Sequence, residues 1–91
     1  MTKLKMLNMV ELSTAHLHPL EAERIKEVSY VDSDTSHLVP TIDECLSDCK
    51  RLYMVCLHDL LLELREKYNV DYVVFDADSS VCEEEFRTYD W

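Results

Sequence analysis

The alternation of hydrophobic and polar residues predicts strands and helices in the order strand, helix, helix, strand. Residues 4–12 (LKMLNMVEL) are mostly apolar and contain no helix breaker, which predicts a strand. Pro19 suits the first turn of a helix that continues to residue 28 with Leu20, Ala22, Ile25 and Val28 facing inward. Residues 29–40 are polar with two brief apolar patches, which predicts a loop containing a short strand or a hairpin.

The longest regular pattern lies between residues 42 and 68, where apolar residues recur at steps of three and four. Thr41 and Glu44 have the spacing of a capping box, in which each side chain bonds a free amide at the helix start. Asn69 tolerates the left-handed backbone that ends many helices. These signals predict one unbroken helix over residues 42–68, about 40 Å long.

Residues 70–75 (VDYVVF) predict a second strand, with an apolar run typical of the middle of a sheet that is covered on both sides. The acidic tail that follows has Phe86, Tyr89 and Trp91 as apolar anchors. The fold class expected is therefore α/β or α+β, a small sheet with one short helix and one long helix packed on it. At 91 residues, the chain is expected to form a single domain over residues 1–91.

The cysteines indicate the cellular compartment of the protein, and the lack of glycine excludes some classes of enzyme. Cys45, Cys49 and Cys56 lie on the same predicted helix, where disulfide geometry is poor, so we expect reduced thiols packed in the core of a cytoplasmic protein. The start of the chain lacks a signal-peptide pattern, and no apolar run is long enough to span a membrane. The absence of glycine excludes the glycine-rich phosphate loops of nucleotide-binding enzymes, and we expect no cofactor.

The net charge of −10 is concentrated in two segments. Residues 27–49 hold six acidic residues and no Lys or Arg, and residues 69–91 hold seven acidic residues with Arg87 as the one basic residue. Such a layout disfavours nucleic acid as a direct ligand and favours a protein partner with a basic surface. The expected partner-binding residues are Asp32, Asp34, Asp43, Glu44, Asp48, Asp76, Asp78, Glu83, Glu84, Glu85 and Asp90.

Two other functions compete with this one. Asp76 and Asp78 follow the last strand, and Ser13, Thr14 and His16 follow the first, so parallel neighbouring strands would bring them to one sheet edge. A small metal-dependent hydrolase or ligand-binding protein using His16, Asp76 and Asp78 is the first alternative. Acids in that position more often cap a strand and begin a turn, and we therefore expect no enzyme. The second alternative is a structural subunit that self-associates through the apolar face of its helix.

The two ends of the chain resemble those of a family of short uncharacterised bacterial proteins with a Ser-Thr-Ala-His start and a Tyr-Asp-Trp end. The segments that carry the resemblance are residues 10–17 (VELSTAHL), 72–78 (YVVFDAD) and 88–91 (TYDW). The matching positions are Ser13, Thr14, His16, Asp76, Asp78, Tyr89, Asp90 and Trp91. The resemblance implies a plasmid, prophage or integrative element as the genomic setting, and no established activity.

Charge and resemblance together predict a non-enzymatic acidic interaction protein of a mobile element. Its most specific form is a phage or plasmid inhibitor of a host nucleic-acid-targeting defence system, such as an anti-CRISPR protein. It would act by nucleic-acid mimicry, occluding the basic cleft of a nucleic-acid-binding protein with its carboxylates.

Overall fold

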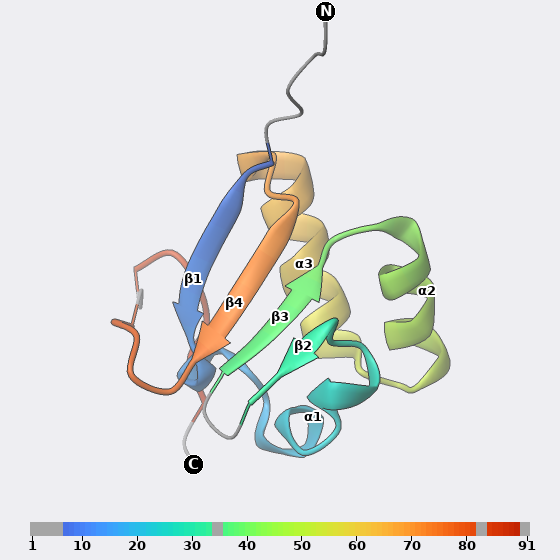
Figure 1. Ribbon diagram of the computed structural model, residues 1–91, viewed down its shortest axis with the longest axis horizontal. Helices are drawn as coiled ribbons and strands as arrows, with labels where there is room; N and C mark the ends of the chain where they lie inside the picture. Colours follow the sequence, from blue (N-terminus) through green and yellow to red (C-terminus); the bar gives the residue numbers. More distant parts are fainter. Residues whose placement is uncertain (1–6, 34–35, 82–83, 90–91) are drawn as a thin grey trace, which may run out of the picture.

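A four-stranded mixed sheet forms one layer of the protein, and helices form a second layer on one face of it (Figure 1). The computed structural model describes residues 7–33, 36–81 and 84–89. The strands are β1 (Met9–Ser13), β2 (Val31–Asp32), β3 (Ser36–Pro40) and β4 (Tyr72–Asp76), in the spatial order β1-β4-β3-β2. Central β4 pairs in parallel with β1 and antiparallel with β3, and β2 and β3 form the predicted hairpin. The predicted α+β fold is confirmed.

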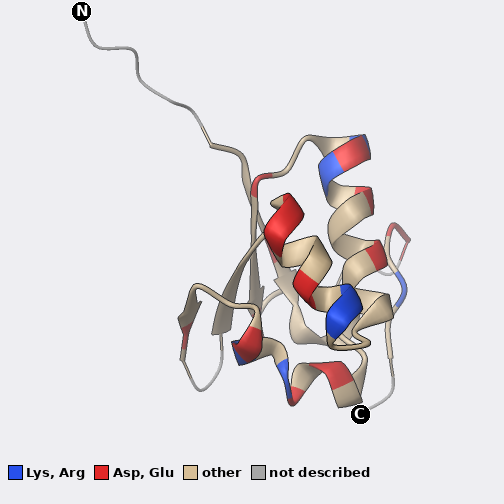
Figure 2. Ribbon diagram, turned by 90° about the vertical axis from the view of Figure 1, so that its right-hand side faces the viewer, with Lys and Arg blue, Asp and Glu red and all other residues tan. Residues whose placement is uncertain are grey.

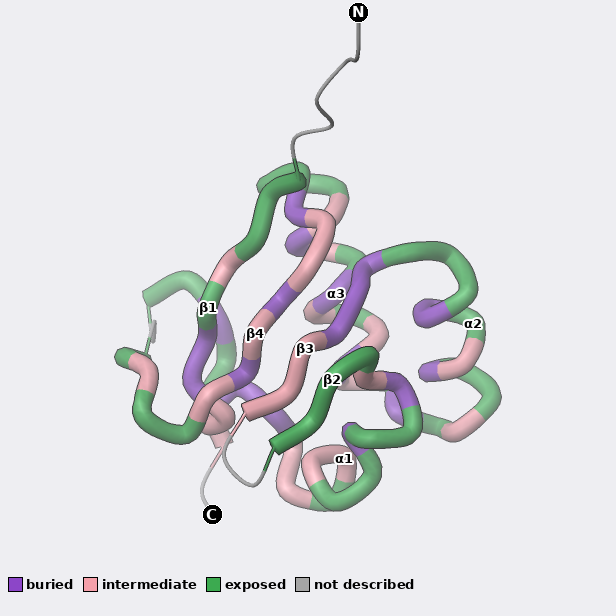
Figure 3. Tube along the Cα trace, viewed as in Figure 1, coloured by how far each residue is buried: buried purple, intermediate pink, exposed green. Residues whose placement is uncertain are grey.

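The helical layer contains two α-helices that lie behind the sheet in Figure 1, α2 (Asp43–Arg51) and α3 (Val55–Tyr68). The connection from β1 to β2 contains the short elements η1 (Thr14–His16), α1 (Pro19–Ala22) and η2 (Ile25–Glu27). Figure 3 shows the most buried stretches of chain where the sheet meets the helices. Val73 and Phe75 of β4 and Leu61 of α3 are all 0% exposed there. Within the described ranges, no helix combines the length and apolar character that a bilayer span requires.

The predicted helix over residues 42–68 is wrong in its extent, because the chain breaks it at Tyr53. Tyr53 has a φ of 60°, which ends α2 in the left-handed conformation. Its N–H donates to the Lys50 carbonyl and the N–H of Met54 donates to the Cys49 carbonyl, the two bonds of a Schellman motif. Met54 thereby enters the core at 1% exposure, while Tyr53 remains 86% exposed. No glycine or proline marks the break, so the apolar spacing runs through it.

The Tyr53→Gly variant is expected to raise the free energy of unfolding by about 0.5–1 kcal/mol. Glycine removes the steric cost of a side chain in the left-handed region, and this gain exceeds the extra flexibility of the unfolded chain. Because the Tyr53 ring is 86% exposed, its removal loses little packing. Thermal unfolding should show a midpoint several degrees higher, roughly 4–8 °C per kcal/mol. Tyr53→Ala is the control, since it removes the ring and keeps the strained backbone; equal midpoints for the two variants would contradict the argument.

The predicted capping box at the start of α2 is also wrong. The N-cap residue is Ile42, which makes no side-chain cap bond. The Thr41 hydroxyl instead donates to the carbonyl oxygens of Val70 (2.7 Å) and Asp71 (3.2 Å), just before β4. Thr41 is only 3% exposed, and a buried hydroxyl requires such a partner. The residue therefore ties the start of α2 to the chain entering the central strand.

Two elements near the N-terminus are shorter than predicted. The first strand starts at Met9 rather than residue 4, and residues 4–6 lie outside the described residues. The helix predicted over residues 19–28 is divided into α1 and η2, and Leu20 is 68% exposed instead of facing inward. Glu21 and Arg24 bond to the backbone around the α2–α3 junction, and these long-range bonds take the place of a continuous helix. Ile25 and Val28 are buried as predicted.

The end of α3 follows the sequence pattern, and the burial of β4 departs from it. Asn69 adopts the predicted left-handed cap with a φ of 54°, and its N–H donates to the Leu64 carbonyl. The sheet, however, is covered on one face only. Val73 and Phe75 face the helices, whereas Tyr72 and Val74 are half-buried on the opposite face, which no helix of the described chain covers.

Candidate functional site

The structure places the two predicted loops at the same edge of the sheet. β1 and β4 are parallel neighbours, and Ser13 lies opposite Asp76 in their register. Each side chain there is used locally. Ser13 Oγ accepts from the N–H of Ala15 (3.1 Å), and Asp76 Oδ1 accepts from the N–H of Asp78 (2.9 Å). These bonds begin the turns that follow the strands, the structural role that short polar residues often have at such positions.

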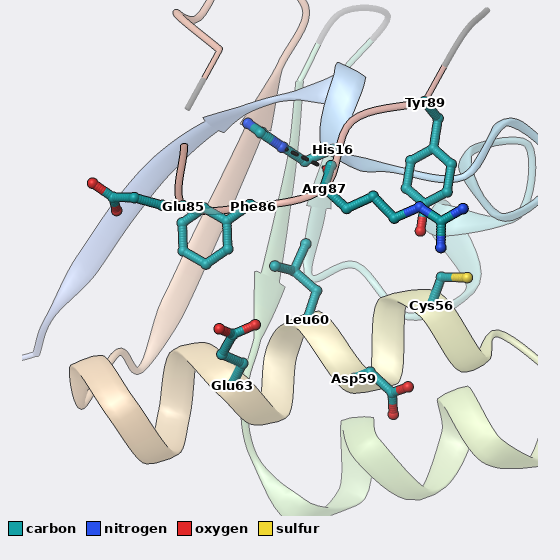
Figure 4. A pocket seen from close by; sticks show the side chains of 9 residues that line it. All are labelled: His16, Cys56, Asp59, Leu60, Glu63, Glu85, Phe86, Arg87 and Tyr89. Carbon is teal, nitrogen blue, oxygen red and sulfur yellow. Dashed lines mark hydrogen bonds between the residues drawn. The ribbon is translucent and has the colours of Figure 1, made fainter. Parts of the chain in front are cut away.

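His16 does not join the two aspartates in a metal site. Its ring is 3% exposed and Nδ1 donates to the Arg87 carbonyl oxygen at 3.0 Å, so the ring is engaged by the C-terminal part of the chain (Figure 4). In the described part of the chain, no three His, Cys, Asp or Glu side chains are grouped so that they could hold a metal ion. The arrangement of His16, Asp76 and Asp78 thus gives no support to the metal-dependent alternative.

A concave feature lies between α3 and residues 84–89, here called the tail (Figure 4). We call it the α3–tail groove, and its volume is about 250 Å³. Its lining residues come from η1, α3 and the tail: His16, Cys56, Asp59, Leu60, Glu63, Glu85, Phe86, Arg87 and Tyr89.

Aromatic contacts hold the tail against the body of the protein. Phe86 is 7% exposed, with its ring centroid 5.9 Å from that of His16 and 5.8 Å from that of Tyr68. The N–H of Tyr89 donates to the Ala15 carbonyl at 3.0 Å. The prediction that Phe86 and Tyr89 anchor the tail is therefore confirmed, while Trp91 lies outside the described residues.

The walls of the groove are mainly acidic. Asp59 and Glu63 lie one turn apart on α3, and Glu85 extends from the tail on the opposite side (Figure 4). The one Arg or Lys side chain among the described lining residues is Arg87, whose guanidinium carbon lies 5.0 Å from the centroid of the Tyr89 ring. Stacking on an aromatic face holds this cation at one end of the groove. Three carboxylates and one guanidinium leave the groove with excess negative charge.

Tyr89 and Cys56 lie beside each other in the same groove. A hydrogen bond with the Cys56 side chain and burial raise the pKa of Tyr89 above its ordinary value, and nearby Arg87 acts in the opposite direction. The phenol is therefore protonated at neutral pH. Cys56 is half-buried, unlike the buried Cys45 and Cys49, and all three are free thiols.

Three of the expected partner-binding residues pair with a basic side chain of the chain itself. Asp32 accepts from His37 Nδ1 (2.6 Å), Asp43 pairs with Arg65, and Asp48 pairs with Arg51 (3.2 Å). Glu44, Asp78, Glu84 and Glu85 are exposed and make no side-chain hydrogen bond or ion pair to the rest of the described chain. Asp34, Glu83 and Asp90 lie outside the described residues.

The two acidic segments meet where β3 pairs with β4, and their outer parts, α2 and the chain after β4, lie apart. In Figure 1, α2 stands at the right and the chain after β4 at the left. Figure 2 shows acidic residues along both α2 and α3, with the basic residues gathered in the last turn of each helix. The acids of α2 and those of the chain after β4 therefore belong to different parts of the molecule, while Asp43 and Asp71 line one shared hollow.

Sequence reasoning identified Glu85 and the aromatic anchors, and it missed the groove wall on α3. The sequence pattern places Cys56 in the apolar stripe of one long helix, and it gives Asp59 and Glu63 no role beyond a polar helix face. Their four-residue spacing, which places both on the same side of a helix, is the pattern that could have suggested a shared surface.

Comparison of the sequence with known protein families identifies the family of this chain. No curated protein matches the chain, and no solved structure matches it. Residues 9–91 match the model described as "Family of unknown function (DUF5983) C-terminal domain", from the first residue of β1 through the tail. The chain therefore belongs to the DUF5983 C-terminal domain family, whose function is unknown.

Proposed function

We propose that this protein is a non-enzymatic interaction protein of a mobile element that acts in the cytoplasm by binding a basic surface on a partner protein. The observation that carries the proposal is the α3–tail groove, whose lining combines the carboxylates of Asp59, Glu63 and Glu85 with the apolar side chains of Leu60 and Phe86. Carboxylates combined with apolar side chains suit the side chain of Lys or Arg, because its stem packs on apolar atoms while its charged end meets the acids.

The distribution of ion pairs favours Glu85, on the tail side of the groove, as the carboxylate available to a partner. Four of the described Lys and Arg side chains already pair with acids of this chain, namely Arg24 with Glu27, Arg51 with Asp48, Arg65 with Asp43, and Lys67 with Glu63. These pairs reduce what Asp43 and Asp48 of α2, and Glu63 of the groove, can offer to a partner. Glu84 and Glu85 have no such partner in the described chain, so their charge is available.

The net charge of −10 supports fast, salt-sensitive association with a basic protein. The more specific form of the proposal is occlusion of a nucleic-acid-binding cleft in a host defence protein, in which the groove carboxylates take the place of phosphates. The genomic setting implied by the Ser-Thr-Ala-His and Tyr-Asp-Trp resemblance supports such a target.

The test removes two negative charges from the groove in one variant and two from elsewhere on the surface in a control. Both variants therefore have the same net charge. Glu63→Gln/Glu85→Gln is compared with Glu23→Gln/Glu66→Gln, two exposed acids that do not line the groove. The probe is a nine-residue arginine peptide, and the measurement is calorimetric titration at low and at physiological salt. The groove variant is expected to bind about fivefold more weakly than the wild type, from two charge pairs of roughly 0.5 kcal/mol each.

The control variant should stay within twofold of the wild type. Equal weakening in both variants would show that the peptide responds to net charge alone and would remove the groove from the proposal. Binding that does not change between the two salt concentrations would contradict the electrostatic mechanism itself.

A further inference from the structure

We propose that the uncovered face of the sheet is a second docking surface, and that it receives a partner protein with an apolar centre and Lys or Arg at its margin. This surface is separate from the α3–tail groove and does not depend on it. We call it the open face and define it by Met9, Val31, Leu38, Tyr72 and Val74.

The strand register places these five side chains on the same side of the sheet. Val74 lies opposite Leu38 on β3, and Leu38 lies opposite Val31 on β2. Met9 lies opposite Tyr72, two residues before Val74 on β4 and therefore on the same face. An apolar band thus crosses all four strands on the side away from α2 and α3 (Figure 1).

The band is accessible. Met9 is 59% and Val31 is 62% exposed, and Leu38, Tyr72 and Val74 are half-buried by their neighbours in the sheet. Figure 3 shows the facing strands in the colours of exposed and intermediate residues along much of their length. Nearby Tyr30 is also 58% exposed, and its ring lies 6.1 Å from that of Tyr72. Contiguous exposed apolar residues of this kind mark interaction sites in proteins that are stable alone.

The composition of β4 points to a cover on this side. A sheet with one solvated face normally alternates apolar and polar residues, whereas continuous apolar runs belong to strands covered on both faces. The segment Tyr72-Val-Val-Phe75 is continuous, and the described chain covers only the side of Val73 and Phe75. The other side has the composition of a strand face that packs against a second layer, which the described residues do not supply.

The charges on the open face indicate which charges the surface of the proposed partner would have. Glu11 lies opposite Val74 and Asp76 lies two residues beyond it, so both carboxylates share the face with the apolar band. None of the four strands contains a Lys or Arg. A second copy would bring the same acids against one another, which is unfavourable for a chain of net charge −10. A different protein, with basic residues around an apolar centre, complements the face in both respects.

The test uses a designed β-hairpin peptide with valine and isoleucine on one face and lysines at its margins, and a matched peptide with glutamate at every lysine. Binding is followed by amide NMR of the ¹⁵N-labelled protein. The lysine peptide is expected to shift the amides of β1, β3 and β4, and the glutamate peptide is not. Leu38→Thr/Val74→Thr, which keeps or gains β-branched residues, should weaken binding at least fivefold.

Leu20→Thr/Val55→Thr is the matched control, since both residues are more than half exposed and neither belongs to the open face. Met9→Thr/Val31→Thr is a second face variant with less effect on folding, because its side chains are 59% and 62% exposed. Three results would overturn the proposal: amide shifts confined to the groove, equal binding of the glutamate peptide, or a dimer in light scattering that the face variants dissociate. The Glu63→Gln/Glu85→Gln variant should bind the lysine hairpin normally, so this test and that of the groove fail separately.

Discussion

Replacing Phe86 with alanine is expected to lower the free energy of unfolding by about 3–5 kcal/mol, the largest effect expected from the tail. Phe86 is 7% exposed and lies between the rings of His16 and Tyr68, which join η1 to the last turn of α3. Its removal leaves a cavity and takes away the apolar contact that holds one wall of the groove. Urea unfolding followed by circular dichroism measures the change through the midpoint and the slope.

Two further variants sharpen this experiment. Phe86→Leu keeps much of the buried apolar volume and should cost clearly less than alanine, while Thr88→Ala changes an exposed tail residue and should leave the midpoint nearly unchanged. A loss below about 1 kcal/mol for Phe86→Ala would mean that the tail does not unfold together with the sheet and helices. In that case the groove could not be regarded as a fixed feature of the fold.

Replacing Glu21 with alanine is expected to lower the free energy of unfolding by about 2 kcal/mol. The Glu21 carboxylate accepts from the N–H of Leu57 (2.7 Å) and from the N–H of Cys56 (3.2 Å), at the first turn of α3. The helix makes no cap bond through its own N-cap residue, Met54. An acid from α1 therefore serves as the cap, and its negative charge also suits the positive end of the helix dipole.

Glu23→Ala is the matched control for Glu21→Ala, because it removes the same charge from an exposed position two residues away. Glu21→Gln should give an intermediate loss, since the amide keeps one oxygen acceptor and lacks the charge. The measurement is again the urea midpoint. If Glu21→Ala and Glu23→Ala gave the same midpoint, the capping role would be wrong and only net charge would matter.

The sequence by itself determined the features that depend on local pattern. The apolar run over residues 72–75 became the central strand, Asn69 ended its helix in the left-handed conformation, and the loop between residues 29 and 40 contained the predicted hairpin. Phe86 and Tyr89 anchor the tail as expected. Such features are encoded by the spacing of apolar residues and by the backbone preferences of single residues, which a linear reading can detect.

Only the tertiary structure decided how these elements meet. Tyr53 breaks the long helix because Met54 gains a place in the core, and Thr41 leaves the predicted capping box because Val70 and Asp71 offer a buried hydroxyl its acceptors. The candidate groove joins residues of α3 to residues of the tail that are more than twenty positions away. Each of these outcomes depends on contacts between residues distant in the chain, whose free energy outweighs the local preference and leaves no mark in the spacing of neighbouring residues.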